Sequence, residues 1–352
     1  MSATPVARAA LLGALCLGLA IAVTGCTEVC YVLQAAAGQD ELGYLARPLD
    51  EALADRTTPR EVRAVLAHVP AVKRYAVESG LTPTDSYEDY VALGRPAVVW
   101  VVSACRPLAF EAKTWWFPIV GTVPYLGWFR PADAARYAGE LAADGWDVDV
   151  RSSSAYSTLG WFPDPVLSTM IPPGDAALGE LVNTVLHESV HATLYVPSQS
   201  SFNESVASFV GDVLTERYLS ARLSPAAPET RAFRRGRKWG ELRQRRMHAV
   251  YLELEKLYAS TLTDAEKLER KGTLLTALRV ELGFRRPISN ATLLGFRTYN
   301  SGMRELEGLF SACAGSVPRF MAALGRLRPE DFGAPAQEDI GGVLEPLKSC
   351  PQ

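Results

Sequence analysis

The chain has 352 residues and a formal net charge of −3 at neutral pH, and 48% of its residues are hydrophobic. This composition supplies a sizeable core for one or two globular domains and excludes an extensively disordered chain. The nearly balanced charge argues against a nucleic-acid partner, because nucleic-acid-binding domains carry an excess of Lys and Arg.

The first 25 residues predict an export signal of the lipoprotein type. Arg8 is followed by an apolar run from Ala9 to Val23 and then by small residues. Val23-Thr24-Gly25-Cys26 resembles a bacterial lipobox, although leucine is usual where Val23 stands. An ordinary signal peptide and an uncleaved anchor are the alternatives. The lipobox implies a periplasm-facing lipoprotein of the bacterial cell envelope, held to the membrane by lipid on Cys26. Thr27, in place of an aspartate, implies the outer membrane.

Four further cysteines could form disulfides in an oxidising compartment: Cys30, Cys105, Cys313 and Cys350. They allow one or two bonds and three complete pairings, among which the sequence does not choose. Buried free thiols are the alternative.

Residues 26–95 predict an N-terminal helical segment, because charged and apolar residues alternate along runs that begin near Pro59 and Pro70. Residues 96–165 predict a small α/β sheet region. It contains a buried strand at 97–103, a helix at 131–143 and another strand at 146–150.

Residues 166–352 predict a helical, zinc-binding catalytic region. Long apolar-periodic runs indicate helices at about 176–194, 202–222, 229–260 and 264–282. Asp175 is a candidate N-cap for the first and Thr263 for the last. The third is rich in arginine, and we interpret this as a solvated helix face rather than as a surface for anionic lipid. His68 and His248 are interpreted as structural.

The chemistry is concentrated in the first of these helices. His187 and His191 lie one turn apart on it and project the same way, so both imidazoles can reach one ion. Glu188 lies beside them, where it can act on a metal-bound water without being a ligand. Two satisfied histidines on a buried helix are the alternative interpretation.

A catalytic zinc usually has three protein ligands, and a second helix returning antiparallel would carry Glu204 past the two histidines. The order His-Glu-x-x-His, turn, Asn-Glu resembles the gluzincin metallopeptidases. This resemblance implies His187, His191 and Glu204 as zinc ligands and Glu188 as general base. The twelve residues between His191 and Glu204 are fewer than in well-known gluzincins.

Such a peptidase needs a donor for the oxyanion of its tetrahedral intermediate. Tyr299 is the first candidate and Tyr156 the second. The stretch Tyr156–Trp161 is also a candidate edge strand that could align a substrate backbone through main-chain hydrogen bonds, or it is simply a core strand.

Together with the lipoprotein-like start, three stretches of the chain resemble the bacterial putative aminopeptidase family: Lys113–Gly121, Ala155–Thr169, and Leu186–His191 with Phe202–Glu204. The resemblance implies a zinc aminopeptidase of the cell envelope that acts on peptides and uses Zn²⁺. The chain lacks the Gly-x-Met-Glu-Asn segment that holds the substrate amine in known gluzincin aminopeptidases. An envelope endopeptidase or cell-wall amidase and a non-catalytic zinc-binding lipoprotein are therefore the alternatives. We expect an α+β fold, predominantly helical, with zincin-like active-site helices flanked by a small β-sheet.

Overall fold

The computed structural model of the chain describes residues 26–117, 121–156, 163–297, 302–334, 337, 339–347 and 350. The predicted export signal, the side chain of Cys26, Tyr299 and residues 157–161 of the predicted substrate strand lie outside this part of the chain. In the residues that are described, no helix is both long and apolar enough to cross a bilayer.

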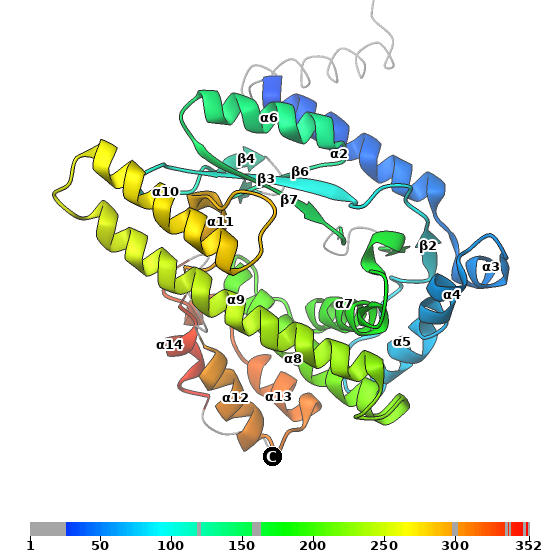
Figure 1. Ribbon diagram of the computed structural model, residues 1–352. Helices are drawn as coiled ribbons and strands as arrows, with labels where there is room; N and C mark the ends of the chain where they lie inside the picture. The colour runs from blue at the N-terminus through cyan, green and yellow to red at the C-terminus, as the bar shows by residue number, and fades with distance from the viewer. Residues whose placement is uncertain are drawn as a thin grey trace, which may run out of the picture.

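Helices dominate the fold and the strands are short, so the prediction of a predominantly helical α+β protein is confirmed (Figure 1). The α-helices are α2 (Cys26–Leu45), α3 (Leu49–Ala54), α4 (Arg60–Leu66), α5 (Val69–Glu78), α6 (Pro131–Ala143), α7 (Ala176–Thr193), α8 (Ser200–Arg222), α9 (Pro228–Tyr258), α10 (Asp264–Glu281), α11 (Asn290–Leu294), α12 (Met303–Ala312), α13 (Val317–Leu324) and α14 (Gly341–Leu344). The strands are β1 (Arg47–Pro48), β2 (Asp89–Val91), β3 (Val99–Cys105), β4 (Trp115–Phe117), β5 (Gly121–Val123), β6 (Leu126–Trp128), β7 (Asp147–Ser153) and β8 (Val166–Leu167).

The main sheet is antiparallel, with β3 between β6 and β7. The predicted buried strand is its centre, since Val99, Val101 and Val102 are each at most 6% exposed. Helices α2 and α6 cover one face of this sheet, and the short α11 packs on the other side (Figure 1). The sheet region therefore forms a layer that faces the α7–α8 pair across the molecule.

A second sheet joins distant parts of the chain. β2 pairs antiparallel with β1 and parallel with β8. These strands of two or three residues lie in stretches for which the sequence predicted helices alone. They are too short to produce a readable periodicity. Helices α3, α4 and α5 share one hydrophobic core with α7, α8 and the C-terminal helices, so residues 26–95 do not enclose a core of their own.

A disulfide joins the end of the chain to the residue that follows α12. Cys313 and Cys350 form a disulfide, which is one of the pairings that the sequence left open, and Cys105 is a buried free thiol.

The two histidines that were predicted to be structural each lie within hydrogen-bond distance of a partner. Nδ1 of His68 lies 3.2 Å from the Tyr218 hydroxyl, and Nδ1 of His248 lies 2.9 Å from the Phe296 carbonyl.

Candidate metal centre

Helix α7 is the central helix of the larger core. One face is apolar and wholly buried through Leu181, Val182, Val185 and Leu186, each at most 1% exposed. Burial of this face stabilises the helix more than any cap does. Asp175 occupies the N-cap position, but its side chain accepts no capping hydrogen bond, so that prediction was wrong in its mechanism. Asp175 has helical dihedrals, with φ −63° and ψ −17°, whereas a capping residue usually has an extended backbone.

The polar face of α7 carries the two candidate ligands. His187 and His191 lie one turn apart, and their Nε2 atoms are 3.1 Å from each other. Their side chains are 19% and 16% exposed, so a small ion or solvent can still reach them.

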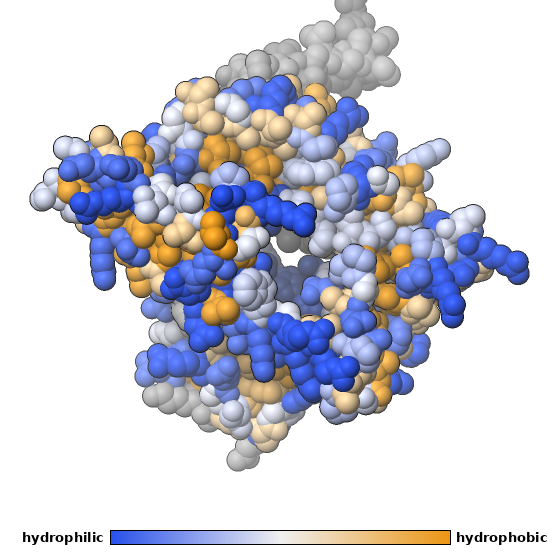
Figure 2. Space-filling model, in the orientation of Figure 1, coloured by the Kyte–Doolittle hydropathy of each residue, from blue (hydrophilic) through white to orange (hydrophobic). Residues whose placement is uncertain are grey.

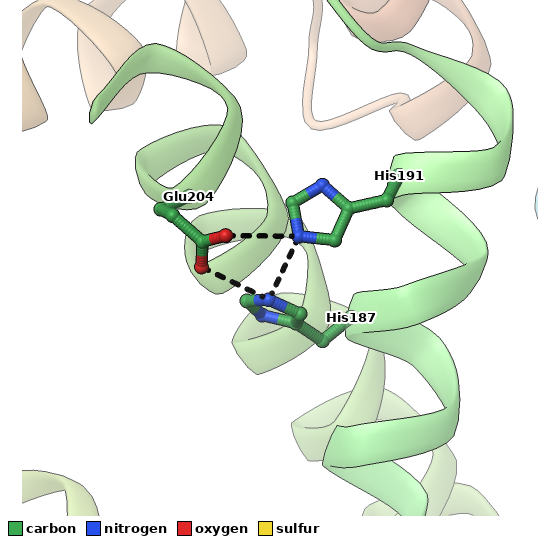
Figure 3. Close-up of side chains that lie close together, drawn as sticks. All are labelled: His187, His191 and Glu204. Carbon is green, nitrogen blue, oxygen red and sulfur yellow. Dashed lines mark hydrogen bonds and ion pairs between the residues drawn. The ribbon is translucent and has the colours of Figure 1, made fainter. Parts of the chain in front are cut away.

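Helix α8 returns antiparallel to α7 and brings Glu204 to the same point (Figure 3). One carboxylate oxygen lies 3.4 Å from Nε2 of His187 and the other lies 3.4 Å from Nε2 of His191. One donor atom from each of the three residues lies within 4.8 Å of the other two. The short connection between the helices thus suffices to bring the three side chains together.

The start of α8 is held by Asn203, which is 3% exposed. Its side-chain oxygen accepts a hydrogen bond from the Val196 N–H, and its amide group donates one to the Val196 carbonyl, both at 2.9 Å. Buried Gln199 in the same loop donates to the Ala334 carbonyl at 2.9 Å. These bonds satisfy the loop backbone and fix the first turn of α8, from which Glu204 projects.

Two helix contacts set the spacing between α7 and α8. At Gly211 a Cβ atom would lie 3.4 Å from the backbone N and Cα of His187, at van der Waals contact, so the two helix backbones pack closely here. One helix turn away from His187, the Asn183 amide donates to Asp212 at 3.0 Å, and Arg237 of α9 binds the same carboxylate at 3.0 Å. Neither pattern nor spacing in the sequence marks Gly211, Asn183 or Asp212, and Arg237 belongs to the arginine-rich run that was interpreted as a solvated helix face.

The charges at this point are strongly coupled. Hydrogen bonds from His187 and His191 hold the pKa of the Glu204 carboxyl at about 2. Burial lowers the pKa of His191, but the hydrogen bond and charge of Glu204 outweigh it, so the pKa is raised. Burial raises the pKa of Glu188, and the neighbouring imidazoles only partly oppose it. A glutamate with a raised pKa is better suited to accept a proton near neutral pH.

The donor set fits a zinc ion. Two imidazole nitrogens that face each other need a proton or a cation between them, and a carboxylate completes three ligands of the types that zinc takes in catalytic sites. Glu188 is adjacent in sequence to His187 and is partly buried, but it does not belong to this three-residue group.

The candidate metal centre lies beside a hollow, and the two tyrosines predicted as oxyanion donors are considered with it. Figure 2 shows a hollow in the middle of one face of the molecule, with α7 beside it in the orientation of Figure 1 and hydrophilic side chains gathered below it, over α9. Some arginines of α9 are paired, since Arg246 contacts Glu281 and Arg237 contacts Asp212. Tyr156 is half-buried with its ring 5.1 Å from that of Phe129. Tyr299 lies outside the described residues, so its assignment stays a prediction.

The fold and the site together define a predominantly helical α+β protein with a His-Glu-x-x-His helix and a glutamate on the following helix beside it. The chain belongs to the family described as "Putative aminopeptidase", whose family model matches residues 30–331. The match runs from α2 to the turn after α13 and includes all four residues of the candidate site. Membership implies a peptidase, and hence a peptide substrate. No curated protein and no solved structure matches the chain.

Proposed function

We propose that the protein is a zinc-dependent aminopeptidase of the gluzincin type. The observation that carries this proposal is the convergence of His187, His191 and Glu204 from two antiparallel helices, with Glu188 next to the first histidine. Family membership supports the peptidase class but does not name the metal or the mechanism. The intact Glu188 favours a catalytic over a structural zinc, because a structural site needs no base beside its ligands.

In this mechanism the chain supplies both proton transfers. His187, His191 and Glu204 would hold the zinc ion, whose positive charge would make water more acidic and polarise the scissile carbonyl. Glu188 takes the proton from the attacking water and delivers it to the leaving amine nitrogen as the carbon–nitrogen bond breaks. The raised pKa of Glu188 suits a group that must first accept and then return a proton.

The proposal includes the cell envelope as the location. The apolar run before Cys26 and its lipobox-like sequence support export and lipid anchoring, with the outer membrane implied by Thr27. The alternatives are an envelope endopeptidase or a cell-wall amidase with the same metal chemistry, and a zinc-binding lipoprotein without activity.

Paired peptides that differ only at the N-terminus test the aminopeptidase proposal. We expect the zinc-loaded soluble chain from Thr27 to release the first residue of an unblocked peptide and to leave its N-acetylated twin intact. Mass spectrometry of the products checks both. Internal cleavage of both peptides would indicate an endopeptidase. Cleavage of a cell-wall muropeptide amide alone would indicate an amidase. If the zinc-loaded chain hydrolyses none of these substrates, the proposal that the protein is an enzyme is contradicted.

A further inference from the structure

Four exposed apolar side chains lie in two segments that meet at the first turns of α2. On α2, Val32 is 50% exposed and Leu33 is 65% exposed, and near β4 and β6 Trp116 is 55% exposed and Tyr125 is 50% exposed. We call these four residues the anchor-side surface. Single apolar side chains are ordinary on a protein surface, whereas a group of them marks contact with another molecule or with a membrane. The candidate metal centre uses none of the four.

Tyr31 of α2 joins the two segments. The centre of its ring lies 5.3 Å from that of Phe117 in β4, and its hydroxyl accepts a hydrogen bond from the Gly127 N–H of β6 at 3.3 Å. Trp116 directly precedes Phe117, and Tyr125 lies two residues before Gly127. The two exposed residues of α2 directly follow Tyr31. Every member of the anchor-side surface is therefore within two residues of this one set of contacts.

The two segments that carry the anchor-side surface contain no charged residue. Residues 29–39 and residues 114–129 lack Asp, Glu, Lys and Arg altogether, although 21% of the whole chain is charged. A face that meets only water normally carries charged side chains. Trp and Tyr, which have an apolar body and a polar tip, instead concentrate where a membrane meets water. The composition therefore favours the headgroup layer of a bilayer as the environment of this surface.

The chain before α2 indicates why a bilayer should lie at this place. Helix α2 begins at Cys26, the candidate lipidation residue, and the apolar run from Ala9 to Val23 ends just before it. Lipid on Cys26 and an uncleaved anchor would both enter the membrane here. Tyr31 follows on the same helix after about 7 Å of axial rise, at roughly 1.5 Å per residue. The headgroup layer is itself roughly 5–7 Å thick, so the anchor-side surface lies within its reach.

We propose that the anchor-side surface docks on the bilayer that holds the N-terminal anchor, with the rings of Trp116 and Tyr125 among the lipid headgroups. An anchor at Cys26 alone would let the protein swivel, and the second contact fixes its orientation. Helices α7 and α8 lie on the other side of the main sheet from α2 (Figure 1). The docked protein therefore holds the candidate metal centre away from the membrane, toward soluble peptides. This inference rests on the envelope location within the proposed function and is independent of the zinc chemistry.

The test follows Trp116 in the full, membrane-anchored chain. The vesicles contain phosphatidylethanolamine and phosphatidylglycerol with acyl chains brominated close to the headgroup, since bromine quenches tryptophan fluorescence only at short range. Relative to unbrominated vesicles we expect quenching of the wild type, and less than half of that quenching in Trp116→Phe. The matched control is Trp239→Phe, which removes a tryptophan of α9 that is 46% exposed and should leave the quenching unchanged. Adding Tyr125→Trp to Trp116→Phe should restore it.

Quenching that survives in Trp116→Phe but is lost in Trp239→Phe would overturn the inference and place α9 on the membrane. No quenching in a chain that floats with the vesicles would also overturn it, because the surface would then face water. Sedimentation showing that the soluble chain from Thr27 dimerises, and that Trp116→Phe does not, would assign the surface to a second copy. If the full chain does not float with the vesicles, the envelope location fails and the inference fails with it. Peptide hydrolysis by the soluble chain tests the zinc peptidase separately.

Discussion

Replacing Glu188 by glutamine is expected to lower kcat roughly 10²- to 10⁴-fold without loss of bound metal. The amide keeps the size and most of the polarity of the carboxylate but cannot accept the proton of the attacking water. His187, His191 and Glu204 are untouched by the change, so the ligand set remains. Steady-state kinetics on an unblocked peptide, with zinc content measured on the same samples, check both parts.

The matched control is Glu180→Gln, the same substitution two turns earlier on α7. It removes one negative charge from the same helix but none of the three candidate ligands, and we expect wild-type kcat. Equal losses in the two variants would mean that the helix needs its charge rather than a base at position 188.

Replacing Asn203 by leucine is expected to lower the free energy of unfolding markedly, because two buried backbone groups lose their partner. Asn203 is the buried partner of both the N–H and the carbonyl of Val196, which is itself 3% exposed. Each buried group left without a partner costs roughly 1–3 kcal/mol, so the free energy of unfolding should fall by about 2 kcal/mol or more. Because Glu204 follows directly, zinc affinity should fall as well.

Urea unfolding with a chelator present measures the loss of folding stability without zinc, and zinc titration measures the loss of zinc affinity. Asn203→Asp is the graded control, because an aspartate still accepts from the Val196 N–H but donates nothing to the carbonyl. We expect it to lie between leucine and wild type in stability. Unchanged unfolding midpoints in both variants would show that the loop before α8 does not depend on Asn203.

The elements with strong local signals were predictable from the sequence. The helix at 131–143 has the predicted bounds, because Pro131 starts it and Asp144-Gly145 ends it. Thr263 caps α10 as predicted, with its hydroxyl accepting from the Glu266 N–H. Glu204 was expected near the histidines because a short turn forces α8 to return along α7, and the structure has it there.

What could not be predicted depends on contacts between distant parts of the chain. The two-residue β1 and β8 exist only because β2 lies between them. The left-handed backbone of Tyr87, with a φ angle of +68°, has no signal in the sequence, and its N–H donates to the carbonyl of the distant Asp164. The role of Asn203 likewise depends on the path of the loop at Val196, although the sequence shows that Asn203 directly precedes Glu204.

Zinc content of the purified soluble chain tests the central claim most directly. Wild type and Glu188→Gln should each hold one zinc ion per chain, whereas His187→Ala and Glu204→Ala should hold none while keeping the circular dichroism of the wild type. A folded wild type that stays empty when zinc is supplied, or a His187→Ala variant that keeps its zinc, would contradict the three-ligand site.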